Sequence, residues 1–156
     1  MVRHAATTWG DREFVVLGRQ RLTYSDAEER SARFARGLLA VGMGKGTRIG
    51  LLAPNSPDWV VAWLAITRIG AVAVLFSTYA KARELGRDLR LADVACLLTV
   101  GDHLGNDYVE RLEEAIQGLE GSTPGGIECP SHPSLRSVHV WGDRVPGWAA
   151  PVGAGI

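Results

Sequence analysis

The sequence has few cysteines, no excess of charge of either sign and no unambiguous membrane-spanning run. Its 156 residues include two cysteines, Cys96 and Cys129, which are isolated and too few for a disulfide scaffold. We therefore expect a protein of the reducing cytoplasm. Seventeen basic and 17 acidic residues give a formal net charge of zero. Without a basic run there is no electrostatic basis for binding nucleic acid, so no nucleic-acid partner is expected.

An apolar stretch at residues 60–76 predicts a helix followed by a buried strand rather than a membrane span. A transmembrane helix needs about 17–25 apolar residues, so this stretch is at the lower limit. Arg68 lies at its middle, where a charge in a bilayer costs about 3 kcal/mol or more. Gly70 divides it into a helix-like half and a β-branched half. Residues 1–10 have no apolar core of a signal peptide, so we expect neither a leader nor a transmembrane segment.

Length and composition are typical of one globular domain. The chain is close to the usual length of about 150 residues per domain. Its residues are 46% hydrophobic and 22% charged, which excludes a disordered tail, a collagen and a coiled-coil rod.

Hydrophobic periodicity predicts a hairpin and then alternating strands and helices. After a short helix at residues 2–9, residues 13–17 and 21–24 are β-prone and flank a turn. An amphipathic helix of about 16 residues follows, begun by a Thr23–Asp26 capping box and stopped by Gly42. The later predicted elements are a strand at 47–53, a helix at 56–70, a strand at 71–76, a helix at 83–91, a strand at 95–100, a helix capped by Asn106 and a strand at 137–141.

The predicted strands have almost no polar face, and helices join them. Such strands belong to a parallel sheet that is covered on both sides. The expected fold class is therefore α/β: a partial doubly wound, mostly parallel sheet with helices on both faces, preceded by a small β-hairpin.

Two segments rich in glycine or proline are candidates for phosphate-binding sites. The segment Gly42–Thr47 precedes a strand, whereas a phosphate loop follows a strand and opens a helix, so it predicts a helix stop and a turn. The segment Pro54–Asp58 does follow a strand and open a helix. Its Ser56 and Asp58 already offer acceptors to the free N–H groups, so capping is the favoured interpretation.

The remaining polar residues form no recognisable catalytic or metal-binding pattern. Adjacent glutamates on helices (Glu28-Glu29, Glu113-Glu114) point in different directions and make poor acid–base partners. No G-x-S-x-G elbow is present. The four histidines lack metal-ligand spacing, namely His4, His103, His132 and His139. We therefore assign no catalytic, cofactor-binding or metal-binding residue.

A series of short motifs nevertheless follows a familiar order. In sequence they are Arg21-Leu22-Thr23-Tyr24, Gly42-x-Gly44-x-Gly46-x-Arg48-Ile49, Pro54-Asn55-Ser56-Pro57-Asp58-Trp59, Gly70-Ala71-Val72, Arg83-Glu84-Leu85, Leu89-Arg90, Ala92-Asp93 and Gly105-x-Asp107-Tyr108-x-Glu110-Arg111-Leu112. This order resembles the N-terminal region of AMP-forming acyl-CoA synthetases, members of the adenylate-forming superfamily of AMP-binding enzymes. The resemblance covers residues 2–148, and we expect residues 149–156 to be an irregular tail.

The resemblance implies a ligase of fatty acid metabolism that activates a carboxylic or fatty acid. Such an enzyme uses ATP and Mg²⁺ to form an acyl-adenylate and then transfers the acyl group to coenzyme A. The family's phosphate loop is rich in Ser, Thr and Gly and ends in Pro-Lys-Gly. It lies downstream of the matched region, and residues 121–126 share only its composition, because they contain no lysine. No cofactor site is thus expected in this chain.

These observations predict a fragment that is inactive as an isolated chain. The change to an Ala/Gly/Pro tail after Trp148 suggests a truncated gene, a frameshift or a fragmentary gene assignment. A cut sheet leaves an unpaired edge, through which the chain could self-associate. The alternatives are a non-catalytic α/β remnant or interaction module without a ligand, and a flavodoxin-like binding domain, which does not explain the motif order.

Overall fold

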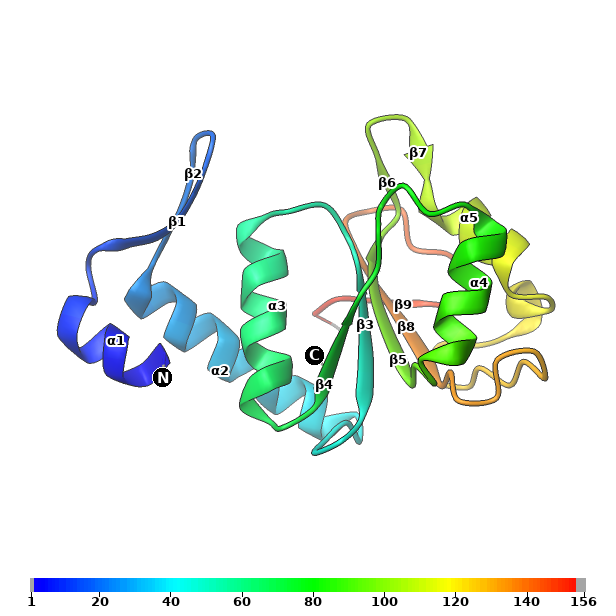
Figure 1. The fold of residues 1–156 in the computed structure, drawn as a ribbon, viewed down its shortest axis with the longest axis horizontal. Coiled ribbons are helices and arrows are strands. Elements are labelled where there is room, and N and C mark those ends of the chain that lie inside the picture. Colours follow the sequence, from blue (N-terminus) through cyan, green and yellow to red (C-terminus); the bar gives the residue numbers. More distant parts are fainter. Residues whose placement is uncertain (1, 154–156) are drawn as a thin grey trace. The chain divides into compact units, whose positions relative to one another are not determined.

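The computed structural model describes residues 2–153, which form two compact units (Figure 1). The helical unit comprises residues 2–45 and 55–71, and the sheet unit comprises residues 46–54 and 72–153. Each unit is a separate structural body, with its own apolar core.

The helical unit consists of three helices and the predicted hairpin. Its elements are α1 (Val2–Trp9), β1 (Glu13–Leu17), β2 (Gln20–Thr23), α2 (Tyr24–Ala40) and α3 (Pro57–Arg68). The strands β1 and β2 pair antiparallel, which confirms the hairpin. The core includes Leu22 and Ala27 from the hairpin and α2, and Val61 and Leu64 from α3.

Local sequence signals set the ends of α2 as predicted. The Asp26 N–H donates to Thr23 Oγ1 over 3.1 Å, and the Thr23 N–H donates to Asp26 Oδ2 over 3.0 Å. This reciprocal pair is the predicted capping box. At the other end, Gly42 adopts a φ of 83°, the left-handed geometry that a residue with a side chain disfavours.

The sheet unit is built on five parallel strands. Its elements are β3 (Arg48–Leu52), β4 (Val72–Leu75), α4 (Ala82–Leu91), β5 (Cys96–Val100), β6 (Asp102–His103), β7 (Asn106–Asp107), α5 (Tyr108–Ala115), the 3₁₀ turn η1 (Leu119–Gly121), β8 (Ser137–Trp141) and β9 (Ala150–Pro151). The order across the sheet is β4-β3-β5-β8-β9, and every neighbouring pair is parallel.

Helices α4 and α5 flank this sheet on one side (Figure 1). They pack on its apolar face through buried residues that include Leu85, Leu89 and Leu112. The two helices approach closely at Gly86, where an added Cβ would lie 2.6 Å from the Ala115 carbonyl oxygen. The fold class is confirmed as α/β, with a parallel sheet flanked by helices and a separate small hairpin.

Three local predictions need correction or extension. The N-cap of α5 is Asp107, whose carboxylate accepts the Glu110 N–H over 3.0 Å, and not Asn106. Asn106 instead belongs to the short hairpin β6–β7, which the sequence did not reveal. A two-residue strand, β9, lies within the tail predicted to be irregular. The boundaries of the predicted domain at residues 2 and 148 stay a prediction.

The apolar stretch at residues 60–76 divides as predicted into the second part of α3 and the strand β4. Across residues 2–153, none of the helices has the length and apolar character that a bilayer span requires.

Candidate functional site

The carboxyl ends of β3 and β5 are the place where this topology would hold a ligand. From β3 the chain passes to β4 on one side and later to β5 on the other, so the strand order reverses between them. Open α/β sheets bind ligands in the crevice at such a switch point. Here the buried Thr99 hydroxyl donates to the Leu52 carbonyl oxygen over 2.9 Å. This hydrogen bond ties the ends of the two strands together.

The end of β5 is covered by the chain's own backbone. At Gly101 an added Cβ would lie 2.6 Å from the Arg144 carbonyl oxygen, so only glycine fits there. The Gly101 carbonyl accepts the Tyr108 N–H over 3.0 Å, and the Arg144 guanidinium pairs with the Asp107 carboxylate. The segment around Arg144 therefore covers the carboxyl end of this strand.

The Asp107 carboxylate serves the structure rather than acid–base chemistry. Burial alone raises its pKa, but the N–H of Glu110 and the Arg144 guanidinium stabilise the charged form. The net effect is a pKa below the ordinary value for aspartate. A carboxylate that is ionised, capped and paired in this way is a weak candidate for a general base.

The hydrogen bonds of Arg111 fix the loop that follows β4. Its Nη1 donates to the carbonyl oxygens of Thr78 and Ala80 over 2.9 and 3.2 Å. Its Nη2 donates to Asn106 Oδ1 over 2.9 Å, and its guanidinium lies 4.9 Å from the centre of the Tyr108 ring. Since these contacts engage the guanidinium, we assign Arg111 to loop positioning and not to phosphate binding.

Both segments that resembled phosphate sites have the structural roles expected from the sequence. Ser56 caps α3, because its hydroxyl accepts the Trp59 N–H over 3.0 Å, and Asp58 pairs with Arg30. The segment Gly42–Thr47 forms turns between α2 and β3. Capping and turn formation are confirmed at these two places.

Two of the four histidines are buried, and they differ in whether their ring nitrogens are hydrogen-bonded. His132 bonds to the Gly86 carbonyl oxygen over 2.8 Å through Nε2 and to the Ser131 hydroxyl over 3.0 Å through Nδ1. His139 lies on β8 with neither ring nitrogen hydrogen-bonded, and burial lowers its pKa. His4 is exposed and His103 half-buried. In the described part of the chain, no three His, Cys, Asp or Glu side chains cluster as metal ligands would.

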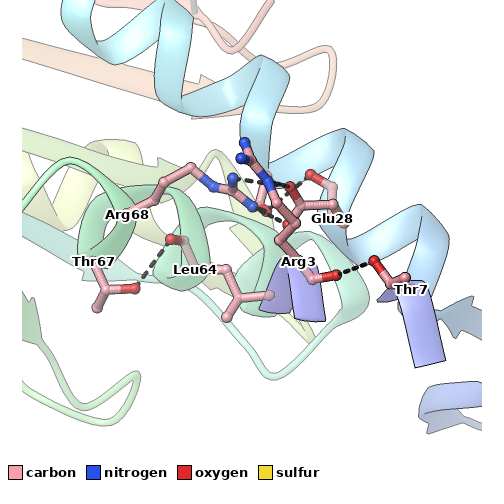
Figure 2. A network of polar contacts seen from close by, with 7 residues as sticks. Arg3, Thr7, Glu28, Leu64, Thr67 and Arg68 are labelled. Carbon is pink, nitrogen blue, oxygen red and sulfur yellow. Dashed lines mark hydrogen bonds and ion pairs between the residues drawn. The ribbon is translucent and has the colours of Figure 1, made fainter. Parts of the chain in front are cut away.

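Sequence reasoning missed a polar network in the helical unit (Figure 2). Arg68 of α3 donates through Nη1 to Glu28 Oε1 of α2 over 3.1 Å, its Nη2 contacts Oε2, and Arg3 of α1 reaches Oε1 at 3.5 Å. The hydrogen bonds from Arg68 hold the pKa of Glu28 below its usual range. No local pattern could reveal this network, since 40 residues separate Glu28 from Arg68.

Two residues of this network, Arg3 and Arg68, also line a groove of about 410 Å³. Its lining also includes Trp63 and Leu64. Because Glu28 compensates the charge of Arg68, the groove is not a strongly cationic site. Glu28 therefore stabilises the contact between α2 and α3 and is a poor candidate for general base catalysis.

The described residues do not fit Mg²⁺-ATP or coenzyme A. A phosphate cradle needs free N–H groups or cations aimed at one point, but the N-caps of α3 and α5 are filled by their own side chains. At the start of α4 the Glu84 carboxylate accepts the Lys81 N–H over 3.2 Å, which disfavours an anion there. The sequence contains two lysines, Lys45 and Lys81, neither of them in a Pro-Lys-Gly segment. We therefore derive no chemical step from these residues.

Comparison with known proteins gives a consistent family. The family model described as AMP-binding enzyme matches residues 2–136. The human medium-chain acyl-CoA ligase ACSF2 is 29% identical over 139 residues, which are 88% of this chain and 23% of that protein. The medium/long-chain fatty-acid–CoA ligase FadD6 of Mycobacterium tuberculosis is 37% identical over 97 residues, which are 62% of this chain and 16% of that protein.

Solved structures agree with this relationship. The anthranilate–CoA ligase AuaEII superimposes with a TM-score of 0.79 over 99% of this chain and 26% of its own, at 18% identity, which shows the shared fold. The N-terminal domain of FACL13 from Mycobacterium tuberculosis superimposes with a TM-score of 0.60 over 63% of this chain and 26% of its own, at 29% identity.

The chain spans between 16% and 27% of the length of the curated relatives that it matches. Its strand order is also that of flavodoxin-like folds, the alternative left open by the sequence. The match over residues 2–136 decides against that alternative. With its motif order, its parallel sheet and its relatives in agreement, the chain belongs to the family of AMP-binding, adenylate-forming enzymes and is similar to the N-terminal region of acyl-CoA ligases.

Proposed function

We propose that these residues are the N-terminal structural part of an ATP-dependent acyl-CoA ligase that activates a fatty or other apolar carboxylic acid. The observation that carries the proposal is the match of residues 2–136 to the AMP-binding enzymes. The substrate class comes from relatives that are named medium- and long-chain ligases. In such a ligase ATP, Mg²⁺ and coenzyme A supply the adenylate and the thioester chemistry, and a cytoplasmic location would suit the isolated cysteines.

Within such an enzyme, this chain would provide a scaffold rather than reacting groups. Thr99, Gly101 and Arg111 hold the strand ends and loops at the carboxyl edge of the sheet in fixed positions. A rigid edge of this kind can position catalytic groups contributed by other segments. It follows that the 156-residue polypeptide alone is a fragment without adenylating activity.

The direct test is acid-dependent exchange of pyrophosphate into ATP by the purified polypeptide, over a panel of medium- and long-chain acids. We expect no exchange above the background without acid. Losing groups that stabilise transition-state charge costs about a hundredfold or more for each group, so the assay has ample range. Exchange that depends on an acid would contradict the scaffold role.

A chimera tests whether the scaffold is functional. The 139 aligned residues of human ACSF2 are replaced by those of this chain, and acyl-hydroxamate formation from a medium-chain acid is measured. We expect activity from this chimera and none from a matched chimera with Gly101→Val, whose side chain collides with the Arg144 backbone. A first chimera that melts cooperatively but forms no hydroxamate would contradict the proposal.

A non-catalytic α/β module is the second candidate. It is favoured by one observation, namely that Asp107, Arg111 and Arg144, near the switch point, are engaged in structural contacts. The two candidates differ in the chimera experiment, because a module that has lost its enzymatic context need not support catalysis in a related ligase.

A further inference from the structure

The two outer strands of the sheet differ in whether they can accept another strand. An edge strand can accept a partner only through N–H and C=O groups that point away from its neighbour. On β9 the Val152 N–H donates to the Val140 carbonyl oxygen of β8 over 2.9 Å. Because backbone direction alternates along a strand, Pro151 is the residue that points outward. Proline has no N–H, so this edge lacks the donor that a further strand would need.

The β4 edge has no such protection. The N–H groups of Val72 and Phe76 donate to the carbonyl oxygens of Thr47 and Leu51, over 2.8 and 3.0 Å. By the same alternation, the N–H and C=O groups of Ala73 and Leu75 point away from β3. Within residues 2–153, no strand lies on that side of β4. Val72–Leu75 contains neither a charge nor a proline, the devices that usually protect an edge.

The side chains beside this edge are apolar and accessible. Val72 is 49% exposed, Leu75 is 54% exposed and Leu91 of α4 is 75% exposed. A groove of about 390 Å³ runs between β4 and the end of α4, lined by residues that include Val74, Phe76 and Leu91. An added strand would project alternate side chains into this groove, as in recognition by strand addition.

We infer that the β4 edge binds a second copy of this chain, with the two β4 strands antiparallel about a two-fold axis. Charge does not oppose this pairing, because β4 is uncharged and Asp88, the charged side chain that lines the groove, is paired with Arg87. Within β4, one register uses all the outward groups of both copies. It pairs Ala73 with the second copy's Leu75, and Leu75 with its Ala73, in hydrogen-bonded pairs.

This register places Val74 of both copies directly opposite each other on the axis, as a non-hydrogen-bonded pair. The Cα atoms of such a pair lie about 4.5 Å apart. The Val74 side chains would meet on the face that carries α4, beside the two grooves. Two parallel sheets would thereby join into one continuous sheet, which removes both accessible β4 edges.

Cysteine cross-linking tests the register. Val74→Cys places two thiols at a Cα separation suited to a disulfide, so mild oxidation should convert the polypeptide to a covalent dimer. Ala73→Cys is the matched control, because diagonal neighbours lie about 7–8 Å apart, beyond ready bridging. The native Cys96 and Cys129 are buried, so the background should be low.

Sedimentation over a range of concentrations tests the edge itself. Ala73→Pro removes the outward N–H but no hydrogen bond to β3, so we expect dimerisation to weaken by at least about tenfold, with far-UV circular dichroism unchanged. Leu17→Lys, which removes an exposed apolar side chain of the hairpin, should leave dimerisation unchanged. A monomeric wild type, a dimer that survives Ala73→Pro, or equal cross-linking at positions 73 and 74 would overturn the inference.

Discussion

The two buried histidines should respond in opposite directions to the same substitution. His132 and His139 are 6% and 4% exposed, respectively, so burial does not distinguish them. The ring of His132 is hydrogen-bonded through both nitrogens, whereas neither nitrogen of His139 has a partner. Leucine is similar in size to histidine but makes no side-chain hydrogen bond, so the difference between the two substitutions reports on the hydrogen bonds of each ring.

The expected magnitudes follow from those hydrogen bonds. A buried polar group without a partner costs about 1–3 kcal/mol, so His139→Leu should raise the free energy of unfolding by about that amount. A typical hydrogen bond contributes about 0.5–1.5 kcal/mol, so losing the two bonds of His132 should lower the free energy of unfolding by about 1–3 kcal/mol. Leucine also adds apolar contact, which at position 139 raises the free energy of unfolding in the same direction as removing the unpartnered ring.

The pH dependence gives a second, independent readout. Because burial lowers the pKa of His139 below 6.5, the unfolded state binds its proton first as the pH falls. The free energy of unfolding should therefore fall below about pH 6.5, by at most about 1.4 kcal/mol per pH unit, until the folded-state pKa is reached. The His139→Leu variant lacks this contribution, so its advantage over the wild type should grow toward acid pH.

Urea denaturation followed by circular dichroism, at about pH 7.5 and about pH 5.5, measures both effects. Low protein concentration removes any contribution from association. If His139→Leu destabilises the protein as strongly as His132→Leu, or keeps the acid slope of the wild type, the description of His139 as a buried group without partners is wrong.

Three further substitutions test other contacts, each by the change in the free energy of unfolding in urea. Ser56→Ala should cost about 1 kcal/mol by removing the N-cap of α3, whereas Ser56→Asp should restore it. Gly101→Val should cost about 3 kcal/mol or more, because its side chain meets the Arg144 backbone; a near-neutral effect would contradict this close approach. Glu28→Gln should destabilise the protein above about pH 4.5 and progressively less at lower pH, where the wild type loses its charged pair with Arg68; a difference that persists at acid pH would refute the ionic account.

Local chemistry was sufficient to predict most of the elements. The capping box at Thr23 and the left-handed Gly42 bound α2, and largely apolar runs mark β3 and β5. Two details could not be predicted from local chemistry. Asn106 and Asp107 are adjacent and are about equally good N-caps, and the β6–β7 hairpin and the pairing with Arg144 select Asp107. Strand β9 has two residues, too few for a periodic signal.

The candidate site was predictable only in outline. The residues after β3 predict that a helix begins there and that Ser56 caps it. They do not predict that Thr99 bonds to Leu52 or that Arg144 covers Gly101, since 47 residues separate the first pair. Contacts between distant segments depend on the strand order, which residue patterns do not encode. The assignment of no catalytic residue stays a prediction.

The wholly parallel sheet also constrains how the chain is made. No two neighbouring strands of this sheet are joined by a hairpin, so a newly synthesised strand cannot pair with the residues that emerge directly after it. The bond between Thr99 and Leu52 spans 47 residues, which a ribosome adds in about 2–10 seconds. Throughout that interval the apolar strand β3 lacks its neighbour β5. Because an exposed apolar strand favours aggregation, fast elongation or a chaperone would protect β3 until β5 arrives.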